Sequence, residues 1–108
     1  MDIKVIVATH KLYRMPGDKM YLPVQAGASL RTPLPYHGDN EGVNISAKNP
    51  TYCELTCLYW AWKNLKADYI GLVHYRRHFR GRTFAGKWDA VLDSGRAGRI
   101  LESSDIIL

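Results

Sequence analysis

Residues 67–82 read ADYIGLVHYRRHFRGR, and within this stretch a short apolar run ends in alternating histidine, aromatic and arginine residues. Residues 69–73 are almost continuously apolar and rich in aromatic and β-branched side chains, which predicts a strand buried on both faces of a parallel sheet. Ligands of open α/β sheets bind beyond the carboxyl ends of the strands, so we expect an anionic substrate here. The side chains expected to contact it are His74, Tyr75, Arg76 and Arg77.

Two further strands are predicted in the first quarter of the chain. Residues 3–8, IKVIVA, form a β-branched run that ends at Thr9 and His10, which places both residues at a strand end and makes them site candidates. Residues 21–26, YLPVQA, predict a short edge strand, because proline cannot donate to a central ladder. The Gly27-Ala28 pair that follows could bring backbone amides close to a phosphate.

A helix is predicted over residues 50–65, with Asn49 as its cap and Pro50 in its first turn. Its expected buried stripe has three- and four-residue spacing and consists of Leu55, Leu58, Tyr59, Trp62 and Leu65. Glu54 lies in the first turn, where it either stabilises the helix through the dipole or faces the site. The helix leads directly into a strand over residues 69–75, which is half of a βαβ unit.

The last part of the chain predicts a short helix over residues 96–103 and another buried strand over residues 105–108. The chain stops inside that strand, so we expect it to be the N-terminal portion of a longer protein and its sheet to be incomplete. The fold class is therefore a single α/β domain over residues 1–108 with a mostly parallel, Rossmann-like sheet.

Size and composition limit the classes of function. The chain has 108 residues, a formal net charge of +5 and two cysteines. One domain fits this length, and the positive charge favours anionic partners. The cysteines, four residues apart, predict reduced, partly buried thiols. No apolar segment has the length of a membrane span or of a signal peptide, which favours a cytoplasmic location.

The clustered arginines favour phosphate recognition, because a guanidinium is a planar fork that matches phosphate oxygens and stays charged. A metal site at His74 and His78 is disfavoured, since no third ligand is in register and the arginines would repel a cation. Aromatic residues alternate with the arginines as in single-strand nucleic-acid binders, so a basic nucleic-acid-binding module remains an alternative, although the basic residues cluster at one strand end.

Several blocks of the sequence resemble a known family. These are VATHKLYRMP, GDNEGVNISAKNPTYCELTCLYWAWKN, DYIGLVHYRRHF and DIIL, in this order. They resemble the DUF4422 domain, which is found in bacterial capsular and exopolysaccharide biosynthesis proteins and is associated with glycosyltransferase activity. The resemblance implies a nucleotide-sugar-dependent enzyme with a fold similar to the N-terminal part of GT-A glycosyltransferases, and some members are linked to galactofuranose transfer.

The resemblance also implies where the donor lies. Thr9 and His10 would lie at the first-strand loop that meets the nucleotide. The family block that borders the donor contains Asp39, Asn40, Asn44, Ser46, Asn49 and Glu54. Among these, Glu54 and Asp39 are the candidates for catalytic roles. His74, Tyr75 and Arg76 stand where GT-A enzymes commonly carry a metal-binding Asp-x-Asp, so we expect a positive side chain to replace the metal ion.

The expected ligands are a nucleotide sugar, with a UDP-sugar as the expected donor, and a glycan or lipid-linked acceptor. No divalent metal, other cofactor or nucleic acid is expected with it. Peripheral membrane association and self-association of the fragment are further expectations. A catalytically inert nucleotide-binding fragment is the other alternative.

Overall fold

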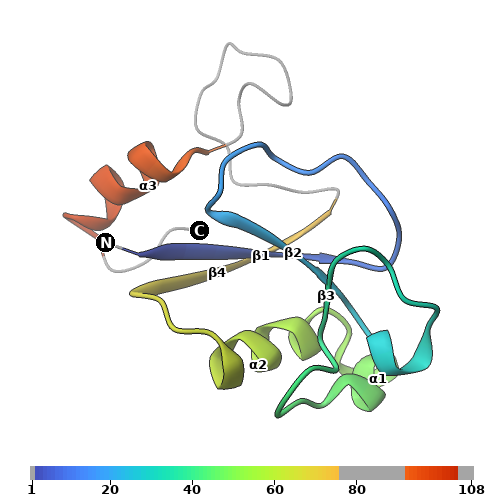
Figure 1. The fold of residues 1–108 in the computed structure, drawn as a ribbon. Helices are drawn as coiled ribbons and strands as arrows, with labels where there is room; N and C mark the ends of the chain where they lie inside the picture. Colours follow the sequence, from blue (N-terminus) through green and yellow to red (C-terminus); the bar gives the residue numbers. More distant parts are fainter. Residues whose placement is uncertain (1, 76–91, 105–108) are drawn as a thin grey trace.

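The computed structural model describes residues 2–75 and 92–104. Its centre is a four-stranded sheet with the order β3-β2-β1-β4, and every neighbouring pair of strands is parallel. The strands are β1 (Ile3–Thr9), β2 (Tyr21–Gln25), β3 (His37–Gly38) and β4 (Tyr69–His74). The predicted parallel α/β architecture is confirmed, with β1 in the middle of the sheet (Figure 1).

Helices cover both faces of this sheet. α2 (Leu55–Asn64) lies on one face and α3 (Ser94–Leu101) on the other, as Figure 1 shows. The four-residue α1 (Asn49–Tyr52) precedes α2, and two 3-10 turns, η1 (Ala28–Leu30) and η2 (Ser46–Lys48), belong to the connections between β2 and α1. A sheet covered on both sides explains why its strands read as continuous apolar runs.

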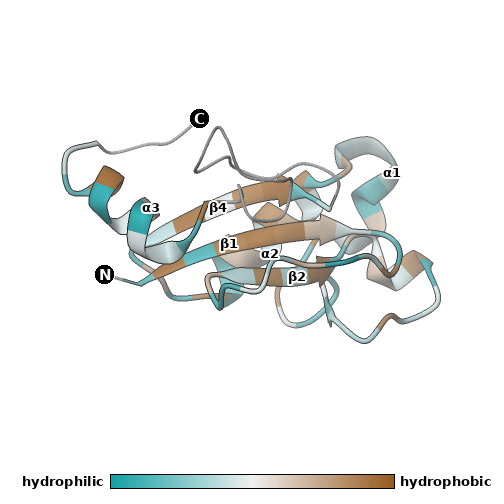
Figure 2. Ribbon diagram, turned by 90° about the horizontal axis from the view of Figure 1, so that it is seen from above, coloured by the Kyte–Doolittle hydropathy of each residue, from teal (hydrophilic) through white to brown (hydrophobic). Residues whose placement is uncertain are grey.

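Alternation along β1 divides the core into two clusters. Val5 and Val7 point toward α3, where they pack with Tyr21, Tyr75 and other residues of that cluster. Ile6 and Ala8 point toward α2 and pack with its inner face. Figure 2 shows much of β1, β2 and β4 in brown, the colour of hydrophobic residues. The C-terminal ends of β1 and β4 therefore present successive side chains to opposite faces.

The predicted continuous helix over residues 50–65 is wrong. The chain breaks between α1 and α2 at Cys53, whose φ of 53° lies in the left-handed region. The predicted stripe is also wrong in part: Leu55 and Trp62 are exposed, whereas Thr56, Cys57, Trp60 and Ala61 are buried. The small side chains of Cys57 and Ala61 let α2 approach the sheet closely, so this face packs in place of the larger apolar one.

Two smaller predictions also need correction. Asn49 is the first residue of α1 and its side chain caps no amide there, although Pro50 lies in the first turn as predicted. β2 is an inner strand, but β3 pairs only with Val24 and Gln25, so Pro23 lies where β2 has no neighbour on that side.

The C-terminal helix is confirmed with shifted ends. α3 spans Ser94–Leu101 and buries Ala97 and Leu101 against the sheet, and Asp93 caps it by accepting from the amide of Arg96 at 2.8 Å. The predicted strand over residues 105–108 lies outside the described residues. None of the helices in the described ranges is both long and apolar enough to cross a membrane.

Candidate functional site

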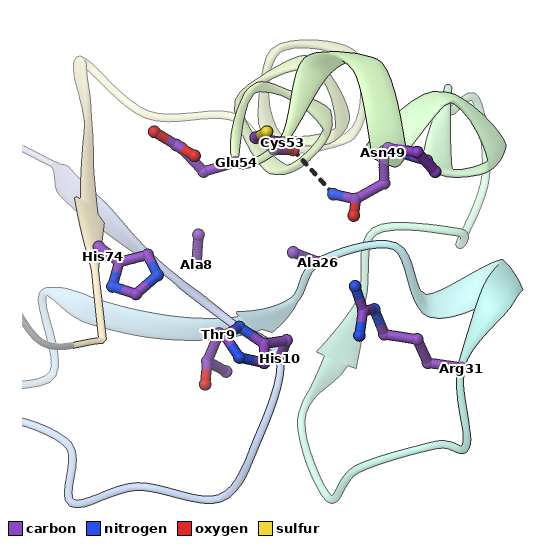
Figure 3. Close-up of a pocket in the computed structure, with 10 residues that line it drawn as sticks. Ala8, Thr9, His10, Ala26, Arg31, Asn49, Cys53, Glu54 and His74 are labelled. Atoms are coloured by element: carbon purple, nitrogen blue, oxygen red, sulfur yellow. Dashed lines mark hydrogen bonds between the residues drawn. The ribbon is translucent and has the colours of Figure 1, made fainter.

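A pocket of about 410 Å³ opens at the carboxyl ends of the parallel strands. The end of β1 contributes Ala8, Thr9 and His10, Ala26 follows β2, and His74 ends β4. The junction of α1 and α2 and the segment after η1 complete the wall with Asn49, Pro50, Cys53, Glu54 and Arg31. Figure 3 shows these side chains around the cavity. The pocket lies at the edge of the sheet where the sequence predicts the ligand.

The side chains that line the pocket include one cationic group, two imidazoles and one carboxylate, a set that suits an anionic ligand. Arg31 is the one lysine or arginine among the described residues that line it, and its guanidinium points into the cavity in Figure 3. The imidazoles of His10 and His74 come from neighbouring strands, with ring centroids 6.3 Å apart. Glu54 is the single carboxylate in the lining as described. The pocket therefore offers hydrogen-bond donors to phosphate oxygens. It also contains one carboxylate, that of Glu54.

Five of the predicted site residues lie together in this pocket. They are Thr9, His10, Asn49, Glu54 and His74. Thr9 contributes little beyond its backbone, because it is 1% exposed and its hydroxyl donates to the carbonyl of Lys11 at 2.6 Å. The other four present polar atoms from three different segments of the chain.

Asp39 lies beside the pocket rather than in it. Its carboxylate is fully buried and accepts four hydrogen bonds from N–H and O–H groups: from the amides of Gly27 and Ala28, at 2.8 and 2.9 Å, and from two hydroxyls. The hydroxyls belong to Ser46 and Thr56, both at 2.5 Å. With both oxygens engaged, Asp39 is placed to hold the β2–η1 loop against η2 and α2.

This network corrects the expectation for the Gly27-Ala28 amides. They do not point to a free phosphate, because the Asp39 carboxylate already occupies the position of the anion. Gly27 has a φ of 63°, which favours glycine, and an added Cβ would lie 2.7 Å from Oδ1 of Asn49. The loop is thus fixed by a side chain of this chain, and the following segment carries Arg31 to the pocket.

Four other candidates do not line the pocket. Ser46 is buried, and its hydroxyl donates to Asp39. Asn40 is exposed in the loop after β3, and Asn44 closes that loop by donating to the carbonyls of Asn40 and Gly42 at 3.0 and 2.8 Å. Tyr75 is 1% exposed and packs in the cluster on the α3 face, because it follows His74 on an alternating backbone. Arg76 and Arg77 lie outside the described residues.

Sequence reasoning did not single out Arg31 or Cys53. Arg31 lies in a stretch rich in turn residues, and its place depends on the left-handed turn at Gly27. Cys53 is exposed in the pocket, so its predicted partial burial is wrong, whereas Cys57 is buried between α2 and the sheet. Burial, together with the nearby charges of Asp39 and Glu54, raises the pKa of the Cys57 thiol far above its usual value, so this thiol stays protonated and packs as an apolar group.

A metal-binding cluster is absent from the part of the chain that the structure describes, in that no three His, Cys, Asp or Glu side chains come together there.

Comparisons with known proteins agree with this architecture. The solved structure entitled "WbbM bifunctional glycosytransferase apo structure" is similar to this chain, with 32% sequence identity and a TM-score of 0.83. The similarity covers 95% of this chain and 22% of the WbbM chain, so this chain spans about a fifth of that protein's length. No curated protein matches. Residues 4–108 match the family described as DUF4422, a domain of unknown function. This match covers nearly the whole sequence, and the chain therefore belongs to the DUF4422 family.

Proposed function

We propose that this chain forms the donor-binding part of a glycosyltransferase that uses a nucleotide sugar, with a UDP-sugar as its donor. The observation that carries the proposal is the pocket at the carboxyl ends of β1, β2 and β4, into which Arg31 and two imidazoles project. The 32% identity to a protein entitled a bifunctional glycosyltransferase supports the same reading.

In the proposed complex the diphosphate of the donor lies against Arg31, with His10 and His74 as further hydrogen-bonding groups. A guanidinium matches phosphate oxygens in a bidentate manner and stabilises the negative charge that develops on the departing diphosphate. We propose on this basis that transfer needs no divalent cation.

Glu54 is the proposed catalytic carboxylate. It lines the pocket, whereas the other candidate, Asp39, is buried with both oxygens hydrogen-bonded. A positioned carboxylate can take the proton of an attacking hydroxyl as the new glycosidic bond forms, which is general base catalysis. Glu54 would take that proton from the hydroxyl of the acceptor.

The wider setting that we propose is bacterial capsular or exopolysaccharide synthesis, with a glycan or lipid-linked acceptor and galactofuranose as one candidate sugar. Family resemblance supports this setting. Peripheral association with the membrane that carries a lipid-linked acceptor belongs to the same proposal.

Isothermal titration with UDP tests the donor site. Wild type should bind UDP, and Arg31→Gln should weaken binding by about 10-fold or more, since a hydrogen bond to a charged group contributes about 1.5–3 kcal/mol. Arg99→Gln is the matched control, because Arg99 is exposed in α3 on the other face of the sheet, and its affinity should equal that of wild type. A chelator should leave the affinity unchanged.

Equal affinities of wild type and Arg31→Gln, or no binding of UDP by wild type, would contradict the proposed site. A parallel titration with a single-stranded oligonucleotide separates the alternative class of function. Tight binding with a steep salt dependence would favour the nucleic-acid-binding module.

A further inference from the structure

We infer that Asn49 selects the nucleotide of the sugar donor by accepting a hydrogen bond from its nucleoside. Thr56 and Asp39 fix the orientation of the Asn49 carboxamide in which it can do so. The inference rests on the proposed function and adds to it the part of the ligand that Asn49 contacts. It depends on which end of the Asn49 carboxamide faces the pocket.

The orientation of this carboxamide is determined by its partners. Nδ2 of Asn49 lies 2.8 Å from the carbonyl oxygen of Cys53, an atom that can only accept. A flipped amide would place two acceptors against each other, so the nitrogen must face Cys53. The second hydrogen of Nδ2 goes to Oγ1 of Thr56 at 3.1 Å.

Thr56 is free to accept that bond because its own proton points elsewhere. Its hydroxyl donates to Oδ2 of Asp39 at 2.5 Å, the shorter of its two possible donations, since the carbonyl of Cys53 is 3.1 Å away. Asp39 in turn is held by the amides of Gly27 and Ala28. A continuous chain of hydrogen bonds thus runs from the β2–η1 loop through Asp39 and Thr56 to Asn49.

The other end of the carboxamide faces the pocket. Asn49 is 8% exposed, and no hydrogen bond to its Oδ1 is found within residues 2–75 and 92–104. In Figure 3 this oxygen points toward the space between Ala26 and Arg31. Gly27 leaves room for it, because a Cβ there would lie 2.7 Å away. An acceptor held in a fixed direction at the wall of the cavity is placed to receive a hydrogen bond from a ligand there.

Because Oδ1 of Asn49 can only accept a hydrogen bond, it can contact only those parts of the ligand that carry a hydrogen-bond donor. Phosphate oxygens are themselves acceptors, so Oδ1 of Asn49 cannot bind the diphosphate, which belongs with Arg31. The donors of a uridine nucleotide are the ribose hydroxyls and the N3–H of the base. Asn49 therefore marks the nucleoside end of the pocket, beside the phosphate end at Arg31.

The test uses UDP and three analogues that each lack one hydrogen-bond donor of the nucleoside: 2′-deoxy-UDP, 3′-deoxy-UDP and N3-methyl-UDP. For wild type, one analogue should bind about 10-fold more weakly than UDP, and the analogue affected identifies the donor group. In Asn49→Ala, UDP itself should weaken and that analogue should bind within about twofold of UDP, because the acceptor is gone.

Variants of Thr56 test how the orientation is set. Thr56→Val should reduce the discrimination, whereas Thr56→Ser, which keeps the hydroxyl, should retain it. Thr51→Val is the matched control, since Thr51 is exposed in α1, and it should behave as wild type. If Thr56→Val does not fold, the Asn49→Ala comparison decides the inference alone.

The inference is overturned if all three analogues bind wild type as UDP does, or if Asn49→Ala keeps the wild-type discrimination. Both results leave the proposed donor site standing, provided that UDP binds and Arg31→Gln weakens it. Failure of wild type to bind UDP would overturn the proposed function and this inference together.

Discussion

At the residue scale, the two carboxylates at the pocket, Asp39 and Glu54, differ in burial and in hydrogen bonding. Asp39 is fully buried and accepts hydrogen bonds from two backbone amides and two hydroxyls, so it fixes the backbone that brings Arg31 and Asn49 to the cavity. Glu54 lines the same cavity and is exposed. Burial and hydrogen-bond partners, rather than residue type, distinguish the structural carboxylate of Asp39 from the carboxylate that we propose for catalysis.

Replacing Glu54 with glutamine tests the catalytic role that we propose for it. Glu54→Gln keeps the shape of the side chain but removes the base, so sugar transfer should fall by about 100-fold or more. The affinity for UDP should stay within about twofold of wild type, because in the proposed complex the diphosphate contacts Arg31 and not Glu54. Transfer rates with a UDP-sugar and titration with UDP measure the two quantities. An unchanged rate would remove Glu54 from the mechanism.

At the element scale, α2 turns a different face to the sheet than its apolar pattern predicts. Trp60 is 4% exposed and packs with Ile6 and Ala8, whereas Trp62 is 65% exposed. The ammonium of Lys63 lies over the ring of Trp62, with its Nζ 3.8 Å from the ring centroid. The break at Cys53 separates the two helices, and the close approach of Cys57 and Ala61 sets the buried face.

The two tryptophans provide a matched pair for testing this face. Trp60→Ala should lower the free energy of unfolding by about 3–5 kcal/mol, because it opens a large cavity between α2 and the sheet. Trp62→Ala should lower it by less than about 1 kcal/mol, mostly through loss of the contact with Lys63. Urea denaturation of both variants measures the difference. Equal losses would contradict the described orientation of α2.

At the scale of the whole molecule, α3 is fastened to the sheet by two contacts with the segment around the start of β2. The hydroxyl of Tyr21 donates to the carbonyl of Leu92 at 2.5 Å, and Asp18 accepts from the amide of Ser94 at 2.8 Å. Burial works to raise the pKa of Asp18, but the amides of Ser94 and Met20 outweigh it and hold that pKa below its ordinary value. α3 is thereby tied to residues more than seventy positions earlier.

The Tyr21 contact predicts a loss of stability at high pH. Burial, with the charges of Asp18 and Asp93, raises the pKa of Tyr21 from 10.0 to about 12. The protonated phenol thus stabilises the folded state fully below pH 10, and this contribution is lost as the pH rises toward 12. Tyr21→Phe should lack this part of the pH dependence, while Tyr52→Phe, at an exposed site, should keep it. Urea midpoints across this pH range measure it, and identical curves for wild type and Tyr21→Phe would contradict the assignment.

The sequence was sufficient for the features that depend on local pattern. The β-branched run of β1 and the apolar run of β4 predicted two central parallel strands, and the polar residues at their ends predicted the position of the pocket. Contacts between distant residues determined the rest. The break at Cys53 and the position of Arg31 follow from Asp39, which binds Gly27 and Thr56, twelve and seventeen positions away. No local pattern carries that information.

The most direct test of the donor site is amide shift mapping by NMR during titration of the wild-type chain with UDP. We expect the largest shifts on the amides of His10, Arg31, Glu54 and His74, which surround the strand-end pocket, and no shifts in α3. Shifts concentrated at α3 and the amino ends of the strands, or no shifts at millimolar UDP, would contradict it.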